Sequence, residues 1–491
     1  MRNNKLRTTI LLVVICLLAG GGLPYLFAAY SNKLVVLIGF MSLFTAFLVV
    51  KKGKIEVYDW LILLFISIPF HDYRIMFGSF FVRMTEVFFV PFMIWAFVQI
   101  YMDKKNSGYV KGIYKEYIVL IFFCLFTFMS AILAENIFIP VYRTSVLIYL
   151  IMLSVLIPQV IKDREKLYFI IKSIIIVSVL ASVFAVFQTF FPVLHPIRPI
   201  PLTNIGSLTI FRSGVGWRNP NYFAFYVSLI IPLTFIMKIS GYFPEKRFIN
   251  RCFALQILGV MSSYSRLAVI SISLTFLCFL WVRGKKIIAA TIFIVLIFLA
   301  VAAFLNMEYI YKHNPYLAAS VFRIARFEAV RENPLLIAGW RRDAWIANIR
   351  MFMDRPLLGV GPFMSTALYA KYKPDDQSYP WDEGLAVHNE FLSLLSERGI
   401  IGIGLFMLFM FFILKRAFDF YTRNKDSADG MLMLGLWATV VNFFWFSFGA
   451  ATIYSVQFWI NIGLIFTVYN LKQTESAEKP MFFRENRQIN N

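Results

Sequence analysis

His388 is the residue of this chain best suited to acid–base chemistry. It is one of only four histidines, and it lies within Val387-His388-Asn389-Glu390-Phe391, where the only long polar segment re-enters an apolar run. A histidine placed there can stay neutral and act as a base near pH 7. A helix that begins here would lower the pKa of the imidazole, whereas Asp382 or Glu383 nearby would raise it. The alternative interpretation is a surface histidine at the start of a helix.

Arginines in short polar segments are the second group that could do chemistry. Segment 191–221 begins rich in proline, which predicts an irregular structure, and it ends in a glycine-containing turn that holds Arg212 and Arg218. Guanidinium groups form paired hydrogen bonds with diphosphate oxygens, so this turn could cradle an anion; a plain turn into the next helix is the alternative. Arg266 follows Ser262-Ser263-Tyr264-Ser265 between two apolar runs. A charge so close to a membrane core indicates a functional residue, unless Arg266 forms the tip of a tight hairpin.

Four further arginines lie in segments that we expect on the same side of a membrane. For them the favoured interpretation is anchoring of long side chains at the membrane surface, not ligand binding. They are Arg74, Arg83, Arg143 and Arg198.

The composition shows what must position these residues. The chain is 59% hydrophobic and 15% charged with a mean hydropathy of +0.70, too apolar for an ordinary soluble globule. Its apolar runs are long enough to cross a hydrocarbon core of about 30 Å. We therefore predict an all-α polytopic membrane protein with about 12–14 spans. The fourteen candidate spans are 9–29, 34–50, 57–70, 86–102, 117–133, 144–161, 167–190, 222–237, 252–264, 267–282, 287–305, 400–414, 431–449 and 453–471.

The distribution of charge predicts the orientation. With the N-terminus inside, the inner segments hold 28 Lys and Arg residues and the short outer segments hold eight. The positive-inside rule therefore places both termini in the cytoplasm, and it explains the net charge of +21 without a nucleic acid partner.

The expected organisation follows from these spans. It comprises N-terminal spans (1–190), central spans with arginine-bearing external loops (191–305), a large external loop with amphipathic helices (306–399), C-terminal spans (400–471) and a cytoplasmic tail (472–491) that we expect to be disordered.

The spacing around His388 resembles a known family. His388-Asn389, nine residues, Gly399, two residues and Gly402 are similar to the signature of the O-antigen ligase and polymerase (Wzy_C) superfamily, at the expected end of a large external loop. These integral membrane glycosyltransferases, with a GT-C-like architecture, act on polyprenyl-diphosphate-linked glycans. The resemblance extends over about 190–415. In the superfamily an arginine stands seven residues before an Asn-Pro-Asn sequence at the start of a helix, and Arg212 has this position relative to Asn219-Pro220-Asn221.

Other blocks of the external loop also resemble the superfamily. Arg342-Asp343-Ala344-Trp345 and Asp354-Arg355-Pro356-Leu357-Leu358-Gly359-Val360-Gly361 are assigned to scaffolding, with Arg341 and Arg342 as candidate glycan or phosphate contacts. Asn389 and Glu390 are candidate supports of His388. The aromatic side chains suited to stacking on sugars, or alternatively to the membrane interface, are Tyr369, Tyr372, Tyr379 and Trp381.

The resemblance implies an inverting transfer of a glycan from undecaprenyl diphosphate to an acceptor hydroxyl. His388 would be the general base, and Arg212 and Arg266, assisted by Arg218, would bind the donor diphosphate. Metal-dependent relatives of this architecture carry acids in the first external loop, whereas Tyr30–Lys33 holds no carboxylate, so we expect neither a metal nor another cofactor.

Three functions remain open at this stage. A polymerase of lipid-linked repeat units, for O-antigen, capsule or a teichuronic-acid-type polymer, is favoured by the length of the chain and the number of spans. A ligase that transfers the finished glycan to a lipid or wall acceptor fits the same mechanism. A flippase for lipid-linked oligosaccharide is the alternative from another class, although the chain shows no internal repeat. The implied location is the bacterial cytoplasmic membrane with an extracytoplasmic active site, and a chain-length regulator is a candidate protein partner.

Overall fold

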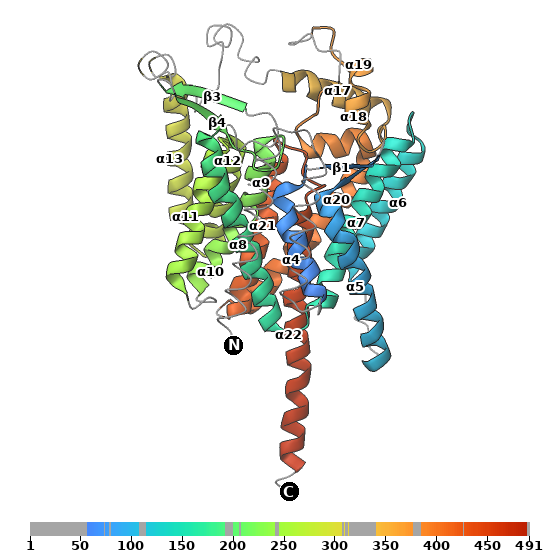
Figure 1. Cartoon of the computed structure of the whole chain (residues 1–491), viewed down its shortest axis with the longest axis vertical. Helices are drawn as coiled ribbons and strands as arrows, with labels where there is room; N and C mark the ends of the chain where they lie inside the picture. Colours follow the sequence, from blue (N-terminus) through green and yellow to red (C-terminus); the bar gives the residue numbers. More distant parts are fainter. Residues whose placement is uncertain are drawn as a thin grey trace.

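The protein is an all-α polytopic membrane protein in which long helices run alongside one another (Figure 1). A computed structural model describes residues 56–72, 74–77, 80–107, 114–191, 200–205, 208–240, 245–306, 309, 313, 340–376, 384–425 and 427–488. The first two expected spans, 9–29 and 34–50, lie outside the described residues.

Helices occupy the positions where the sequence predicts the remaining spans. Seven are long and apolar enough to cross a membrane within the described part of the chain, and three shorter apolar helices accompany them. The long helical segments are α5 (Met84–Ser107), α6 (Lys115–Ile132), α7 (Phe138–Val160), α8 (Arg164–Phe190), α9 and α10 (Pro220–Ser228 and Ile231–Ser240), α20 (Glu390–Arg423) and α21 (Ala428–Ser447). The other helices of the bundle are α4 (Val57–Ser67) with the 3-10 turn η2 (Ile68–Phe70), α11 (Lys246–Ser262), α12 (Arg266–Val282), α13 (Lys286–Leu305) and α22 (Val456–Gln488).

One continuous apolar core holds the bundle together. Helix α8 packs against α11, α7 against α22, and α10 against α21, while α20 lies between α6 and α21. Side chains with no exposed surface fill these contacts, among them Trp459, Phe443 and Phe406. Many apolar side chains elsewhere remain exposed, such as Ile294 and Phe298 on α13, which suits a surface that faces lipid.

The C-terminal helix extends further than expected. Segment 472–491 was predicted to be disordered, but α22 continues to Gln488 and projects from the end of the bundle opposite the hairpins (Figure 1). Residues 472–479 contain no glycine or proline and several good helix formers, which accounts for the first turns beyond the apolar core; the helix then also includes Pro480.

Two β-hairpins lie at the other end of the bundle, which we call the His388 end (Figure 1). Strand β1 (Arg74–Phe77) pairs with β2 (Phe80–Arg83), and β3 (Ile200–Ile205) pairs with β4 (Leu208–Arg212). The irregular structure predicted from the prolines is wrong at its end, because Ile200 and Pro201 already belong to β3, and residues 192–199 lie outside the described residues. Pro201 is tolerated in a two-stranded hairpin because each strand is an edge strand, whose backbone N–H groups need to pair with only one neighbour.

A small second core covers the His388 end. Helix α17 (Trp340–Asp354) and the short helices α18 (Met364–Ala367) and α19 (Tyr369–Tyr372) enclose Ala344, Ala347, Met351 and Met364. Helix α17 also packs directly against α20. Helix α17 is thus one of the amphipathic helices expected in the external loop 306–399, and it packs against α20 and α19.

Candidate functional site

His388 lies directly before the helix that carries the superfamily motif. Asn389 caps α20, because its side-chain Oδ1 accepts a hydrogen bond of 3.1 Å from the Leu392 backbone N–H. Trp345 Nε1 on α17 donates a bond of 3.0 Å to the Val387 carbonyl. The residues on both sides of His388 are therefore fixed, Asn389 by its cap of α20 and Val387 by its bond to α17.

The surroundings of His388 keep its imidazole neutral. Burial, and secondly the charge of Arg341, lower the pKa of His388 from 6.5 to about 4. Both effects disfavour the imidazolium form, so the side chain is available as a base throughout the neutral pH range. The sequence left open whether a helix N-terminus lowers this pKa or nearby carboxylates raise it; the shift is downward, with burial as its largest cause. Asp382 and Glu383 lie outside the described residues.

Arg341 lies close enough to interact electrostatically with both His388 and Arg266. Arg341 is half-buried on α17, and burial together with the charge of Arg266 lowers the pKa of Arg341. One guanidinium thus lies within electrostatic range of both His388 and Arg266. Clustered positive charge beside a neutral base is an arrangement that favours an anionic ligand.

A turn between two helices brings Arg212 to the same region. Arg266 is the first residue of α12, and Ser263-Tyr264-Ser265 connects it to α11, which ends at Ser262. Arg212 Nε donates a bond of 3.1 Å to the Ser263 carbonyl, and its Nη2 donates one of 3.1 Å to Asn221 Oδ1. The predicted hairpin tip and the predicted anion cradle are therefore one structure, in which Arg212 lies against the turn that ends at Arg266.

A buried glutamine shapes the loop between Arg212 and Arg218. Gln188, with no exposed surface, accepts bonds at Oε1 from Ser213 Oγ (2.6 Å) and the Val215 N–H (2.8 Å), and its Nε2 donates to the Val215 carbonyl (3.2 Å). Arg218 is exposed, and its backbone N–H donates a bond of 3.0 Å to Asp72 Oδ2. The loop thus directs Arg212 and Arg218 to different neighbours.

Strained backbone is concentrated near this loop and around His388. Four residues other than glycine have a positive φ among the described residues: Val215 (53°), Tyr264 (51°), Phe363 (66°) and His388 (47°). Such conformations cost free energy and persist only where the surroundings enforce them, which is frequent at functional sites.

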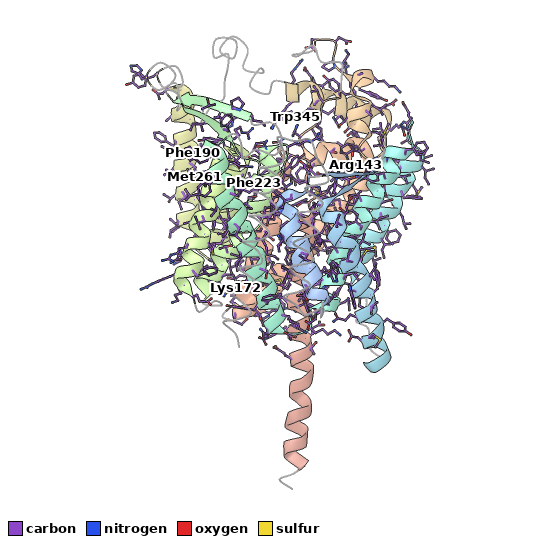
Figure 2. All side chains as sticks on the ribbon, in the orientation of Figure 1. Arg143, Lys172, Phe190, Phe223, Met261 and Trp345 are labelled. Atoms are coloured by element: carbon purple, nitrogen blue, oxygen red, sulfur yellow. The ribbon has the colours of Figure 1, made fainter. Side chains whose placement is uncertain are left out.

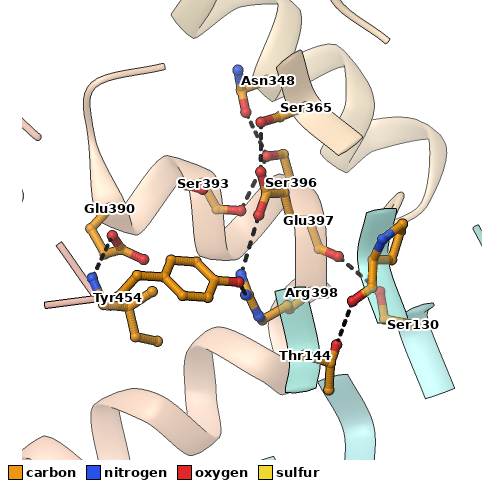
Figure 3. A network of polar contacts seen from close by, with 12 residues as sticks. Ser130, Thr144, Asn348, Ser365, Glu390, Ser393, Ser396, Glu397, Arg398 and Tyr454 are labelled. Carbon is orange, nitrogen blue, oxygen red and sulfur yellow. Dashed lines mark hydrogen bonds and ion pairs between the residues drawn. The ribbon is translucent and has the colours of Figure 1, made fainter. Parts of the chain in front are cut away.

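A buried polar network fixes the first turns of α20 (Figure 3). Glu397 accepts a bond of 2.6 Å from Ser365 and pairs with Arg398 at 3.2 Å, and Arg398 Nη2 donates 2.9 Å to the Tyr454 hydroxyl. Glu390, 1% exposed, accepts the backbone N–H groups of Thr452 and Ile453. The network therefore joins α20 to α18 and to the loop before α22, and it supports the segment that presents His388.

The motif glycines form the seam between α20 and the loop after α17. Gly399 has φ 66° and interrupts α20, and a Cβ there would lie 2.2 Å from the Leu357 carbonyl oxygen. Gly359, with φ 72°, approaches the Glu397–Arg398 peptide equally closely. The spacing of nine residues between Asn389 and Gly399 thus sets the length of the helical segment before the bend.

Other predicted residues have different surroundings. Arg342 pairs with Asp343 and Asp376, so its guanidinium serves the loop itself. Tyr369 is fully buried in the small core and has no open ring face for sugar stacking. Tyr372 is half-buried, its hydroxyl bonds to Asp354, and its role in stacking stays a prediction. Tyr379 and Trp381 lie outside the described residues.

The sequence held little indication of two residues that lie beside the candidate site, Arg341 and Gln188. Arg341 was considered only together with Arg342, and nothing in an isolated pair of arginines tells which one faces the site. Gln188 lies inside an apolar run, where a lone polar residue was the only available signal.

The class of protein that these features define is a polytopic membrane protein with a half-buried neutral histidine beside clustered arginines. Residues 252–407 match the model of the O-antigen ligase family, about a third of the 491 residues. This match confirms the resemblance to the O-antigen ligase/polymerase superfamily, whose members catalyse glycosyl transfer in membranes. The matched region contains Arg266, Arg341 and His388, whereas Arg212 and Arg218 precede it. No curated protein matches the chain.

Proposed function

We propose that this protein polymerises undecaprenyl-diphosphate-linked oligosaccharide repeat units for a surface polysaccharide. The observation that carries the proposal is the position of His388, which is neutral and lies within the range of the Arg341 charge inside the region matched to the O-antigen ligase family. Transfer takes place on the outer face of the bacterial cytoplasmic membrane, with both termini in the cytoplasm.

The proposed step is an inverting displacement. The acceptor hydroxyl attacks the anomeric carbon of the donor, His388 takes the hydroxyl proton, and the bond from the sugar to the diphosphate oxygen breaks. Arg212 and Arg266 bind the departing diphosphate and stabilise its charge, with Arg341 contributing from α17 and Arg218 from the preceding loop. Diphosphate is a good leaving group, so these fixed cations can take the place of a metal.

Binding of the donor activates the base in this mechanism. Before binding, the charge of Arg341 disfavours protonation of His388. A diphosphate seated on Arg266 and Arg341 neutralises that charge, and an anion near an imidazole raises its pKa. His388 therefore becomes a stronger base only when the leaving group is in place.

A ligase that transfers the glycan to a lipid or wall acceptor remains the alternative on the same site. The base His388 and the arginines that bind the diphosphate could act on any acceptor hydroxyl. A flippase is the alternative of another class. It would move the lipid-linked glycan without changing its length, and it would need no general base.

Mass spectrometry of the products separates these functions. Purified protein is incubated with the undecaprenyl-diphosphate-linked repeat unit of its host, next to His388→Ala and the surface variant Arg350→Gln. The proposal predicts a ladder of longer glycans on undecaprenyl diphosphate, formed by Arg350→Gln and absent with His388→Ala. Product only after an added acceptor would mean a ligase. Movement of the lipid across the bilayer without any change in glycan length, in wild type and His388→Ala alike, would mean a flippase.

A further inference from the structure

A polar cavity lies at the His388 end, and neither Arg212 nor Arg266 lines it. It has a volume of about 260 Å³, and η2, β2, α7, α9 and the loop 451–456 enclose it. Its polar lining consists mainly of His71, Asp72, Arg83, Arg143, Tyr222 and Tyr454. Figure 2 shows Arg143 towards the same end of the bundle as Trp345 on α17, and Lys172 towards the opposite end.

Arg83 is a buried cation in this cavity. Its side chain is 6% exposed, and its Nη1 lies 3.1 Å from His71 Nε2. A guanidinium can only donate, so His71 Nε2 accepts, and the His71 Nδ1 hydrogen points to Thr85 Oγ1 at 3.1 Å. His71 is therefore the neutral tautomer and adds no charge. Arg83 Nε has no hydrogen-bond partner within the described part of the chain. Anchoring at the membrane surface, which the sequence favoured for Arg83, does not fit this burial.

Arg143 adds a second cation from the first turns of α7. Its guanidinium carbon lies 3.6 Å from the centre of the Phe363 ring and 5.9 Å from that of Tyr454. The charges of Arg83 and Arg143 repel each other. No carboxylate forms an ion pair with either arginine among the described residues.

The lining of the cavity holds more cationic than acidic side chains. Glu86 Oε2 accepts the backbone N–H of Arg83 (2.9 Å), but Glu86 does not line the cavity. Glu397 is paired with Arg398, and Glu390 is bound by backbone N–H groups. Asp72 is the only acidic side chain of the lining within the described residues, and it accepts the Arg218 N–H. Two guanidinium groups and one carboxylate thus line the same cavity, and an anionic ligand would reduce the excess positive charge.

We propose that this cavity binds the diphosphate of a second polyprenyl-linked molecule, the acceptor of the transfer. The inference rests on the proposed function and deepens it, because a polymerase must hold two diphosphate-linked substrates at once, whereas transfer to another acceptor requires only one. Arg83 and Arg143 bind the acceptor diphosphate, and Arg212 and Arg266 bind that of the donor.

The cavity is connected to the base. Thr452 lines the cavity, and its N–H binds Glu390, two residues after His388. Arg218, next to Asp72, belongs to the same loop as Arg212. The acceptor headgroup in the cavity is thus adjacent to the elements that position both the base and the donor arginines.

Direct binding measurements test this site without turnover. Native mass spectrometry on the His388→Ala protein, with undecaprenyl diphosphate as the probe, counts bound lipids and gives their affinities. We expect two lipids on this background. Adding Arg143→Gln should weaken one of them at least tenfold, and Arg212→Gln with Arg266→Gln should remove the other. Arg350→Gln, which alters an exposed arginine of α17, should leave both, and Arg143→Lys should retain part of the affinity.

Further probes identify the ligand chemistry. Undecaprenol should not occupy the Arg143-dependent site, and undecaprenyl monophosphate should bind there more weakly than the diphosphate. Inorganic diphosphate should compete with the lipid. Equal binding of undecaprenol and undecaprenyl diphosphate at that site, or unchanged stoichiometry and affinity in Arg143→Gln, would overturn the proposal. Arg83→Gln is interpreted only with an unchanged thermal unfolding midpoint, because Arg83 is buried; Arg143→Gln carries the test if that variant is unstable.

The two proposals can fail separately. If no glycan ladder forms but the second lipid binds in an Arg143-dependent way, the cavity is correct and the polymerase is not. If the ladder forms and Arg143→Gln binds and elongates like wild type, the polymerase is correct and the acceptor site is not.

Discussion

The pH dependence of the reaction is the most informative prediction about His388. If His388 is the base, the acid limb of kcat/KM reports its pKa in the free enzyme, because this quantity compares the free enzyme with the transition state. The expected limb lies at about 4, and an unperturbed histidine would place it near 6.5. Because the pKa of His388 lies below that of a free histidine, the reactive neutral form persists at acidic pH. It is lost only as the pH falls through about 4.

The size of the effect is easily measured. At pH 5.5 a base with a pKa of about 4 remains roughly 97% neutral, and one with a pKa of 6.5 is only about 9% neutral. Wild-type kcat/KM should therefore keep nearly its full value at pH 5.5, about tenfold more than an ordinary histidine would allow. Because the bound diphosphate neutralises Arg341, the acid limb of kcat should lie at a higher pH than that of kcat/KM.

Arg341→Gln tests the electrostatic part of this reasoning. Removal of the cation should raise the kcat/KM limb, but burial is the larger cause of the shift, so the limb should stay below 6.5. The assay is the initial rate of glycan elongation from about pH 3.5 to 8, so that the range includes the expected limb, with Arg350→Gln on the same helix as the control. A wild-type limb near 6.5, or a limb that moves down in Arg341→Gln, would refute the assignment.

Three further predictions concern the scaffold and the chemistry. Gly399→Ala should lower stability by at least about 1 kcal/mol, because alanine must adopt φ 66° against the Leu357 carbonyl, whereas Gly404→Ala, with open space around it, should not; the thermal midpoints in detergent should differ accordingly. Glu397→Gln should cost about 3–5 kcal/mol, because it leaves the buried Arg398 without its charge partner, whereas Glu135→Gln in an exposed pair should cost less than about 1 kcal/mol; equal midpoints would disprove this role for the network. EDTA should leave the elongation rate unchanged, and a loss restored by magnesium or manganese would reject metal independence.

The positions of the membrane-spanning helices were largely predictable, because apolar runs are local properties of the sequence. Helices were found at the expected positions of the described spans, and the bend at Gly399 was found at the motif glycine. The β3–β4 hairpin was missed because four prolines between 192 and 201 dominated the local pattern. Helix α22 was underestimated because polar composition alone does not end a helix that has already formed.

The grouping of the site residues could not be predicted from spacing. Arg212 and Arg266 are 54 positions apart, and the hydrogen bond from Arg212 to Ser263 that brings them to one turn depends on the packing of α9, α11 and α12. The choice between Arg341 and Arg342 depends on which side of α17 faces α20, and that was unknown without the fold. The cavity of Arg83 and Arg143 joins β2 to α7, and the sequence treats these as separate anchors.

The central claim is that His388 is the base of a glycosyl transfer supported by the surrounding arginines. The most direct measurement is the initial rate at which the lipid-linked repeat unit is consumed by wild type and by His388→Ala, at pH 7 and with matched thermal midpoints. Loss of a general base predicts a rate lower by about 10²–10⁴-fold with donor binding retained. A His388→Ala protein that elongates the glycan within about twofold of the wild-type rate would contradict the account.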